Sequence, residues 1–230
     1  VHPDDIELGC AGTIVKHIEL GFTVGALDLT QGELGTRGSA EIRAQEAIDA
    51  TQILDLKFRE NLNFEDGFVT ADNKQHQLEI VKKIRKYQPD IVLCNAIEDR
   101  HPDHARAAKL VSNACFLAGL PKIQTELKGI NQSAWRPKQV LHYIQWQPLK
   151  PDFVIDISEQ IEKKIVVVKA YKSQFFDPSS KEKETPISSQ QFINSISYRA
   201  SDLGRLIGVE YAEGFTSDKL IGIDRLDQLL

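Results

Sequence analysis

Short hydrophobic segments alternate with longer amphipathic stretches along the chain. The short segments carry β-branched residues and predict strands, which cover Thr23–Thr30, Lys57–Phe64, Asp90–Ala96, Gln139–Trp146 and Asp152–Ile157. The longer stretches repeat apolar residues at three- and four-residue spacing and predict helices, which cover Leu8–Leu20, Ser39–Leu54, Asn73–Tyr87, Asp103–Gly119 and Ser188–Ile207. This alternation predicts an α/β fold with a Rossmann-like, mostly parallel sheet and helices on both faces.

Local signals add detail to these elements. Ser39 is placed to cap its helix, and Ser158 to cap a helix that follows the strand Asp152–Ile157. The segment Asp90–Ala96 is continuously apolar, which is typical of a strand buried on both faces of a parallel sheet. After Ile207 we expect a polar C-terminal tail.

The chain has 230 residues and shows no internal repeat. The most linker-like stretch, 177–186, is short and favours a surface loop. We therefore expect one domain over residues 1–230. Because Val1 stands directly before a conspicuous polar motif, we also expect that a strand belonging before Val1 is missing from this sequence.

Composition narrows the function classes. The net charge of −5 argues against a dedicated binder of nucleic acid or anionic membranes. No apolar run approaches the ~18 residues of a membrane-spanning helix. Cys10, Cys94 and Cys115 lie far apart in apolar stretches, which predicts buried free thiols in a reducing compartment, so we expect a cytoplasmic protein.

Two short motifs stand out, His2-Pro3-Asp4-Asp5 and His101-Pro102-Asp103-His104. A chain with six histidines and nine prolines would contain a His-Pro-Asp triplet by chance far less than once, yet this chain contains two. Each motif precedes a predicted helix. The second also follows a predicted strand, at the sheet edge where doubly wound folds bind their ligands.

The residue types in these motifs fit a metal. A catalytic zinc takes about three protein ligands, commonly imidazole and carboxylate, and leaves one position for water. Two histidines and one carboxylate could be drawn from His2, Asp5, His101 and His104, and the remaining acid could act as a general base. The alternative is structural, with helix-capping aspartates and loop histidines that follow rigid prolines.

The segment HPDDIE at residues 2–7, followed by Leu8-Gly9, together with HPDH at residues 101–104, resembles the LmbE/PIG-L-like family of zinc-dependent N-acetylglucosamine deacetylases. The resemblance implies one zinc per chain, with His2, Asp5 and His104 as its ligands. It implies Asp4 as the general base, His101 as the group that stabilises the oxyanion, and Asp103 as the residue that orients an active-site histidine. Adjacent carboxylates cannot both bind one zinc comfortably, which agrees with this division between Asp4 and Asp5.

Four further segments resemble the branch of that family that deacetylates N-acetylglucosaminyl-malate in bacillithiol biosynthesis: residues 32–47, 91–104, 143–146 and 170–175. The resemblance suggests Arg43 and Asp66 as sugar-binding residues. Arg37 is the best local partner for a malate carboxylate, and Glu33 is a further substrate-binding candidate. The alternative for each of these residues is a structural role, either in a surface ion pair or in a turn.

Other interpretations stay open. The same fold and metal could serve another N-acetyl sugar or a small amide. Gly32, Gly35 and Gly38 could form a nucleotide-binding loop in a non-catalytic Rossmann-like module, but their spacing is not G-x-G-x-x-G. A serine hydrolase lacks its G-x-S-x-G motif. The resemblance also implies a homo-oligomer, a trimer or a hexamer, that acts on a small N-acetyl sugar conjugate.

Overall fold

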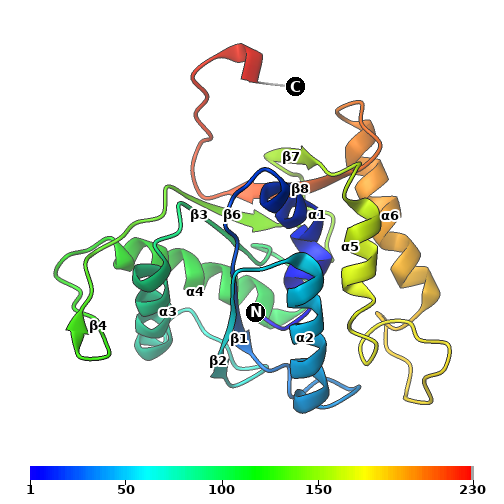
Figure 1. Cartoon of the computed structure of the whole chain (residues 1–230), viewed down its shortest axis with the longest axis horizontal. Coiled ribbons are helices and arrows are strands. Elements are labelled where there is room, and N and C mark those ends of the chain that lie inside the picture. Colours follow the sequence, from blue (N-terminus) through cyan, green and yellow to red (C-terminus); the bar gives the residue numbers. More distant parts are fainter. Residues whose placement is uncertain (229–230) are drawn as a thin grey trace. The chain divides into compact units, whose positions relative to one another are not determined.

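The structure is a computed structural model that describes residues 1–228 (Figure 1). It divides into two compact units. The first unit comprises Val1–Gly67 and Phe153–Gly214, and the second comprises Phe68–Asp152 and the chain that follows Gly214. Helices alternate with strands in both units, which confirms the α/β prediction. The expected single domain over residues 1–230 stays a prediction.

The first unit combines helices with parallel strands. In chain order its elements are α1 (Asp5–Glu19), β1 (Ala26–Thr30), α2 (Ala40–Leu54), β2 (Arg59–Phe64), β7 (Phe153–Asp156), α5 (Ile161–Val168), α6 (Gln190–Arg205) and the start of β8 (Ala212–Ser217). Strand β1 lies beside β2 (Figure 1) and pairs with it in parallel. Leu27 stands opposite Glu60 in this pair. Helix α1 packs on α2 and α5, and α5 packs on α6.

The second unit also mixes helices and strands. Its elements are α3 (Lys74–Tyr87), β3 (Ile91–Cys94), α4 (Pro102–Ala118), β4 (Glu126–Leu127), β5 (Ile130–Asn131), β6 (Gln139–Tyr143) and the short 3-10 helix η1 (Leu226–Gln228). Helix α3 packs on α4. Strand β3 pairs in parallel with β6, and β6 pairs antiparallel with the end of β8.

Side-chain caps explain where several helices begin. The Ser39 side chain accepts a hydrogen bond from the Ile42 amide, as the sequence predicted. Asn73 caps α3 and Ser189 caps α6 in the same way. These caps satisfy amide groups that have no partner within the helix, and they fix the ends of the strand-to-helix connections.

Three details differ from the sequence-based expectation. The polar tail after Ile207 in fact contains β8, whose residues from Ala212 to Thr216 are buried. Its glycine and polar residues do not form a pattern typical of a strand. The segment adopts extended structure because it pairs with β6. Ser158 does not cap α5, which begins after Gln160, because the Ser158 hydroxyl donates to Asp156 instead. The short hairpin of β4 and β5 was not predicted.

A further correction concerns β3. The expected strand Asp90–Ala96 shortens to Ile91–Cys94, and only Cys94 is buried. Ile91 is half exposed. Within the described residues β3 lies at the edge of its sheet, with β6 as its neighbour. An edge strand has no neighbouring strand along one of its hydrogen-bonding edges, which leaves its side chains more accessible than those of a central strand. The hydrophobic run did not reveal this edge position.

Cys10, Cys94 and Cys115 are all buried free thiols, as predicted. Burial raises the pKa of Cys94 well above its ordinary value and that of Cys115 to about 12. Over residues 1–228, no helix combines the length and hydrophobicity that a membrane crossing requires.

Candidate active site

The first motif, His2 to Asp5, leads into α1 and is buried throughout. The Val1 carbonyl accepts hydrogen bonds from the amides of Leu29 and Thr30, so the motif begins beside β1. Asp4 is the N-cap residue of α1 and has φ of 114°. Such a backbone angle is rare for a residue other than glycine, and strained residues of this kind cluster at functional sites.

His2 lies between two carboxylates. Its Nδ1 is 3.4 Å from Asp5 Oδ2, and its Nε2 is 2.9 Å from Asp66 Oδ1. Burial alone would lower the pKa of His2, but the charge of Asp5 and hydrogen bonds to Asp5 and Asp66 raise it above its ordinary value. The first motif therefore concentrates an imidazole and carboxylate oxygens in a buried place.

Asp4 contacts an arginine of α2. Its Oδ2 accepts a hydrogen bond from Arg43 Nη2 at 2.7 Å, and Arg43 also donates to the Gly32 carbonyl at 3.1 Å. Burial raises the pKa of the Asp4 carboxyl to about 6, although the charge of Arg43 lowers it. A carboxyl with this pKa can both accept and return a proton near neutral pH.

The residues suggested for sugar binding all belong to the first unit, and three of them contact one another or the first motif. Asp66 meets His2, and its second oxygen accepts from the Leu34 amide at 3.0 Å. The Glu33 carboxylate accepts from the Asp66 amide at 2.9 Å. Arg43 pairs with Asp4. Arg43 and Asp66 thus contact the first motif and Glu33 contacts Asp66, while their roles in sugar binding stay predictions.

Arg37 has an internal partner. It is buried, and its guanidinium donates to Glu182 Oε2 at 3.3 Å and to the Ser180 hydroxyl at 2.7 Å. Glu182 also accepts from the Gly38 amide. The loop that carries Arg37 is therefore joined to the segment around Ser180 by a carboxylate of this chain.

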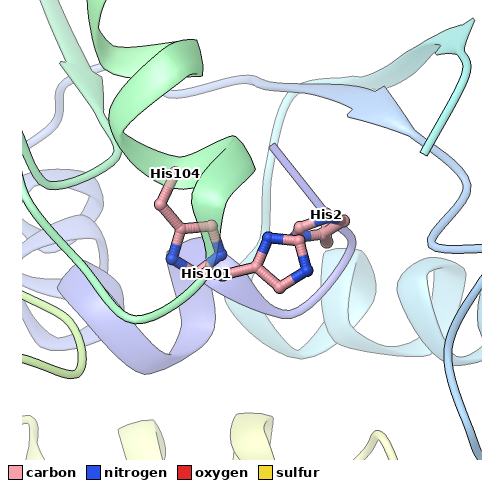
Figure 2. Close-up of side chains that lie close together, drawn as sticks. All are labelled: His2, His101 and His104. Carbon is pink, nitrogen blue, oxygen red and sulfur yellow. The ribbon is translucent and has the colours of Figure 1, made fainter. Parts of the chain in front are cut away.

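The second motif begins α4. His101 is the N-cap residue, its Nδ1 accepts from the Asp103 amide at 3.3 Å, and Pro102 occupies the first turn. The rings of His101 and His104 are stacked with centroids 5.1 Å apart. Figure 2 shows His104 on the first turn of α4, His101 directly before that helix, and His2 on the segment that leads into α1.

Asp99 is a residue whose role the sequence did not reveal. Its Oδ2 lies 2.7 Å from His104 Nδ1, and it also accepts from the backbone amides of Trp146 and Gln147. Burial by itself would raise the pKa of Asp99, but the hydrogen bonds, led by that from His104, hold it below its ordinary value. In the sequence, this contact is indicated only by the position of Asp99 shortly before the candidate metal ligand His104.

Asp103, expected to orient a histidine, is fully buried. Its carboxylate is 3.5 Å from the Arg106 guanidinium, while its backbone amide donates to His101. Its predicted role through the carboxylate stays a prediction.

The donors in each unit suit zinc. In the first unit, His2 and Asp5 present a nitrogen and an oxygen close together. In the second unit, a carboxylate on Nδ1 of His104 favours the tautomer whose lone pair is on Nε2, as in carboxylate–histidine–zinc arrangements. The residues of both motifs therefore fit a catalytic metal in chemical type.

Residues 1–115, which include both motifs, match the PIG-L family, described as GlcNAc-PI de-N-acetylase. The chain belongs to this family. PIG-L deacetylases hydrolyse N-acetyl amide bonds and depend on a metal, so the chain is a hydrolase of this type.

Three similar proteins extend this result. The diacetylchitobiose deacetylase of Thermococcus kodakarensis is 32% identical over 76% of this chain and 67% of its own length. The crystal structure of the conserved protein TT1542 from Thermus thermophilus is 34% identical, with a TM-score of 0.84, and the match covers 97% of this chain and 94% of that one. The N,N'-diacetylchitobiose deacetylase of Pyrococcus horikoshii, solved with its inhibitor MPG, is 25% identical with a TM-score of 0.77, covering 94% and 80%.

Proposed function

We propose that this protein is a zinc-dependent deacetylase that removes the acetyl group from an N-acetylglucosaminyl conjugate, with N-acetylglucosaminyl-malate as the substrate. The observation that carries the proposal is the first motif, where a buried Asp4 with a pKa of about 6 adjoins the His2 and Asp5 donors. Family membership, which rests on a stretch containing both motifs, supplies the reaction type.

We propose that His2 and Asp5 of the first motif and His104 of the second bind one zinc ion per chain. Zinc in such a site would lower the pKa of a bound water and polarise the amide carbonyl. Asp99 and Asp66 support this assignment, because each holds a ring nitrogen of a proposed ligand at hydrogen-bond distance. Carboxylates in that position orient ligating histidines.

The chain's own residues would move the protons. Asp4 accepts a proton from the attacking water, whose oxygen bonds to the acetyl carbon. His101 donates a hydrogen bond to the oxyanion that develops on the carbonyl oxygen. When the C–N bond breaks, Asp4 returns the proton to the departing amine, and acetate and a free amino sugar are released. Asp103 would orient a histidine during these steps.

The sugar would be held by Arg43, Asp66 and Glu33. Arg43 and Asp66 already contact Asp4 and His2, so a sugar bound through them would place its acetamido group next to the motif. The contacts within the first unit support this, because they gather these side chains around one segment. The cytoplasmic location and the trimeric or hexameric assembly stay predictions.

The malate carboxylates need fixed cations, and Arg37 is the proposed partner. The carboxylate of Glu182 already pairs with Arg37, so the guanidinium of Arg37 can donate hydrogen bonds to a carboxylate at this position. An anionic aglycone would therefore take the place of Glu182. The competing substrate is a neutral N-acetyl sugar such as diacetylchitobiose, the compound for which two similar proteins are named.

An amine-release assay on N-acetylglucosaminyl-malate, diacetylchitobiose and N-acetylglucosamine separates these substrates. A charge-assisted contact contributes ~1.5–3 kcal/mol, or roughly ten- to a hundred-fold in affinity. We therefore expect the malate conjugate to be preferred, Arg37→Ala to reduce that preference by this factor, and Glu182→Gln to increase it. Lys183→Gln, in the same exposed segment, is the matched control.

Two results would contradict this substrate. A higher kcat/KM on diacetylchitobiose than on the malate conjugate would assign the protein to the neutral sugars. A malate preference that survives Arg37→Ala would move the anion site to another cation, with Arg100 and Arg106 as the next residues to test.

A further inference from the structure

Helix α1 is interrupted just after the first motif. Cys10 has φ of −146° and ψ of 20°, which is outside the helical region, and the helix continues on its far side. In a regular helix the Gly12 amide would donate to the Leu8 carbonyl across this point. Kinks of this kind occur where side chains insert into the backbone hydrogen bonds.

A buried ion pair lies at the interruption. Lys164 of α5 donates to the Leu8 carbonyl at 2.8 Å and to Glu213 of β8 at 2.5 Å. Glu213 accepts from the amides of Gly12 at 3.0 Å and Thr13 at 2.7 Å. The side chains of Lys164 and Glu213 are only 4% and 3% exposed. The pair thus binds backbone groups on both sides of Cys10.

The helix approaches its neighbours closely at the same place. A Cβ on Gly12 would lie 2.7 Å from the Ile157 side chain, so only glycine fits without a shift. A buried charged pair is costly unless further hydrogen bonds satisfy it, and here three backbone groups do so. An apolar pair of the same size would fill this space but could not bind those groups.

The first turn of α1 requires external support. Asp4 has a left-handed backbone, and such strain persists only where the surrounding structure holds the residue in place. The Leu8 carbonyl is one helical turn from Asp4, and the Leu8 amide donates to the Asp4 carbonyl at 3.0 Å. A cation on the Leu8 carbonyl is therefore well placed to fix the turn that begins at Asp4.

We propose that Lys164 and Glu213 are positioning residues for the first motif: their ion pair holds the two halves of α1 so that Asp4 and Asp5 keep the geometry needed for the metal and the proton transfer. The proposal rests on the proposed function for the roles of Asp4 and Asp5. The positioning of α1 itself can be measured without that function.

The test compares single and double variants of the full chain. Lys164→Met leaves a lone buried carboxylate, which lowers the stability of the fold in itself, so the double variant carries the test. Lys164→Met/Glu213→Gln removes both charges, avoids the lone carboxylate, and keeps the side chains nearly equal in size. Asp202→Asn/Arg205→Gln, which removes an exposed pair on α6, is the matched control.

Three readouts apply to each variant. Hydrogen exchange of the peptide containing residues 5–13 reports the positioning of α1, chelator competition reports zinc affinity, and kcat and KM report the reaction. For the double variant we expect exchange in residues 5–13 to be at least ten-fold faster, while exchange in α6 is unchanged. Zinc affinity and kcat should each fall roughly ten- to a hundred-fold, as for other residues that orient metal ligands, with KM nearly unchanged.

A double variant with wild-type exchange in residues 5–13 would overturn the proposal, as would faster exchange with wild-type zinc affinity and kcat. If the wild-type protein neither bound zinc nor deacetylated an N-acetyl sugar, the proposed function would fail. The exchange measurement would then still decide whether the pair holds α1.

Discussion

The two His-Pro-Asp motifs have the same first three residues but different backbones. In the first, Asp4 adopts a left-handed conformation and its carboxylate pairs with Arg43. In the second, Asp103 follows His101 into a regular helix, and His101 caps that helix with its own ring nitrogen. The first motif is strained and held by charges, whereas the second is a relaxed helix start.

The triplet alone therefore does not assign the chemistry. The surroundings of the two motifs differ: burial and Arg43 act on the pKa of Asp4, while Asp99 contacts His104. Under the proposed function the first motif would supply the base, and Asp99 would orient His104 of the second motif.

Substitution of the two equivalent aspartates should separate the motifs most clearly. Asp4→Asn should keep metal but lose about 10²–10⁴-fold in kcat, because the amide cannot accept a proton. Asp103→Asn should lose only about ten-fold, because its proposed role is to orient a histidine. Steady-state kinetics with metal analysis of both variants measure this, and equal losses would remove the distinction between the motifs.

The next prediction concerns the metal. Asp5→Ala and His104→Ala should each lose bound zinc, because two remaining ligands compete poorly with buffer. Asp99→Asn should retain zinc with roughly ten- to a hundred-fold weaker affinity, measured by chelator competition. The exposed neighbour Glu98→Gln is the control. Full zinc occupancy in Asp5→Ala or His104→Ala would refute the ligand assignment.

The smallest expected difference between the regions around the two motifs concerns the buried thiols, Cys10 in the first unit and Cys94 and Cys115 in the second. The raised pKa values of Cys94 and Cys115 keep both as neutral thiols at pH 8, since a thiol ionises only as the pH nears its pKa. Native protein should therefore react slowly with iodoacetamide at that pH, and urea-unfolded protein should react at all three cysteines. Zinc should slow labelling of Cys10 severalfold more than that of Cys94, because α1 begins at the proposed ligand Asp5 and directly follows the segment that holds His2. Mass spectrometry measures the labelling at each cysteine. Rapid labelling of Cys94 in the native protein would contradict the prediction that it is a neutral, buried thiol.

Much of the fold followed from local patterns. The caps at Ser39 and Asn73, the helix ends and the parallel pairs β1–β2 and β3–β6 agree with the expected α/β arrangement. The pattern failed at β8, because its buried Glu213 is polar and is paired with Lys164, a residue far away in the chain. No local signal could show such a pairing.

The candidate site, too, could be predicted only in part. The sequence identified the two motifs, and the family match covers both. The sequence did not reveal that Arg37 pairs with Glu182 or that Asp99 contacts His104, because each contact depends on how separate loops fold back. The left-handed backbone of Asp4 could not be predicted either, because an aspartate at this position does not by itself indicate a positive φ.

The antiparallel pairing of β8 with β6 also matters for biosynthesis. Residues 215–217 bind residues 141–143, so this pairing cannot form until the chain has left the ribosome as far as Ser217. Both units are likewise assembled from segments that are distant in the chain. During translation the nascent chain therefore exposes β6 without this partner strand, and unpaired strand edges of this kind favour aggregation in incompletely folded chains.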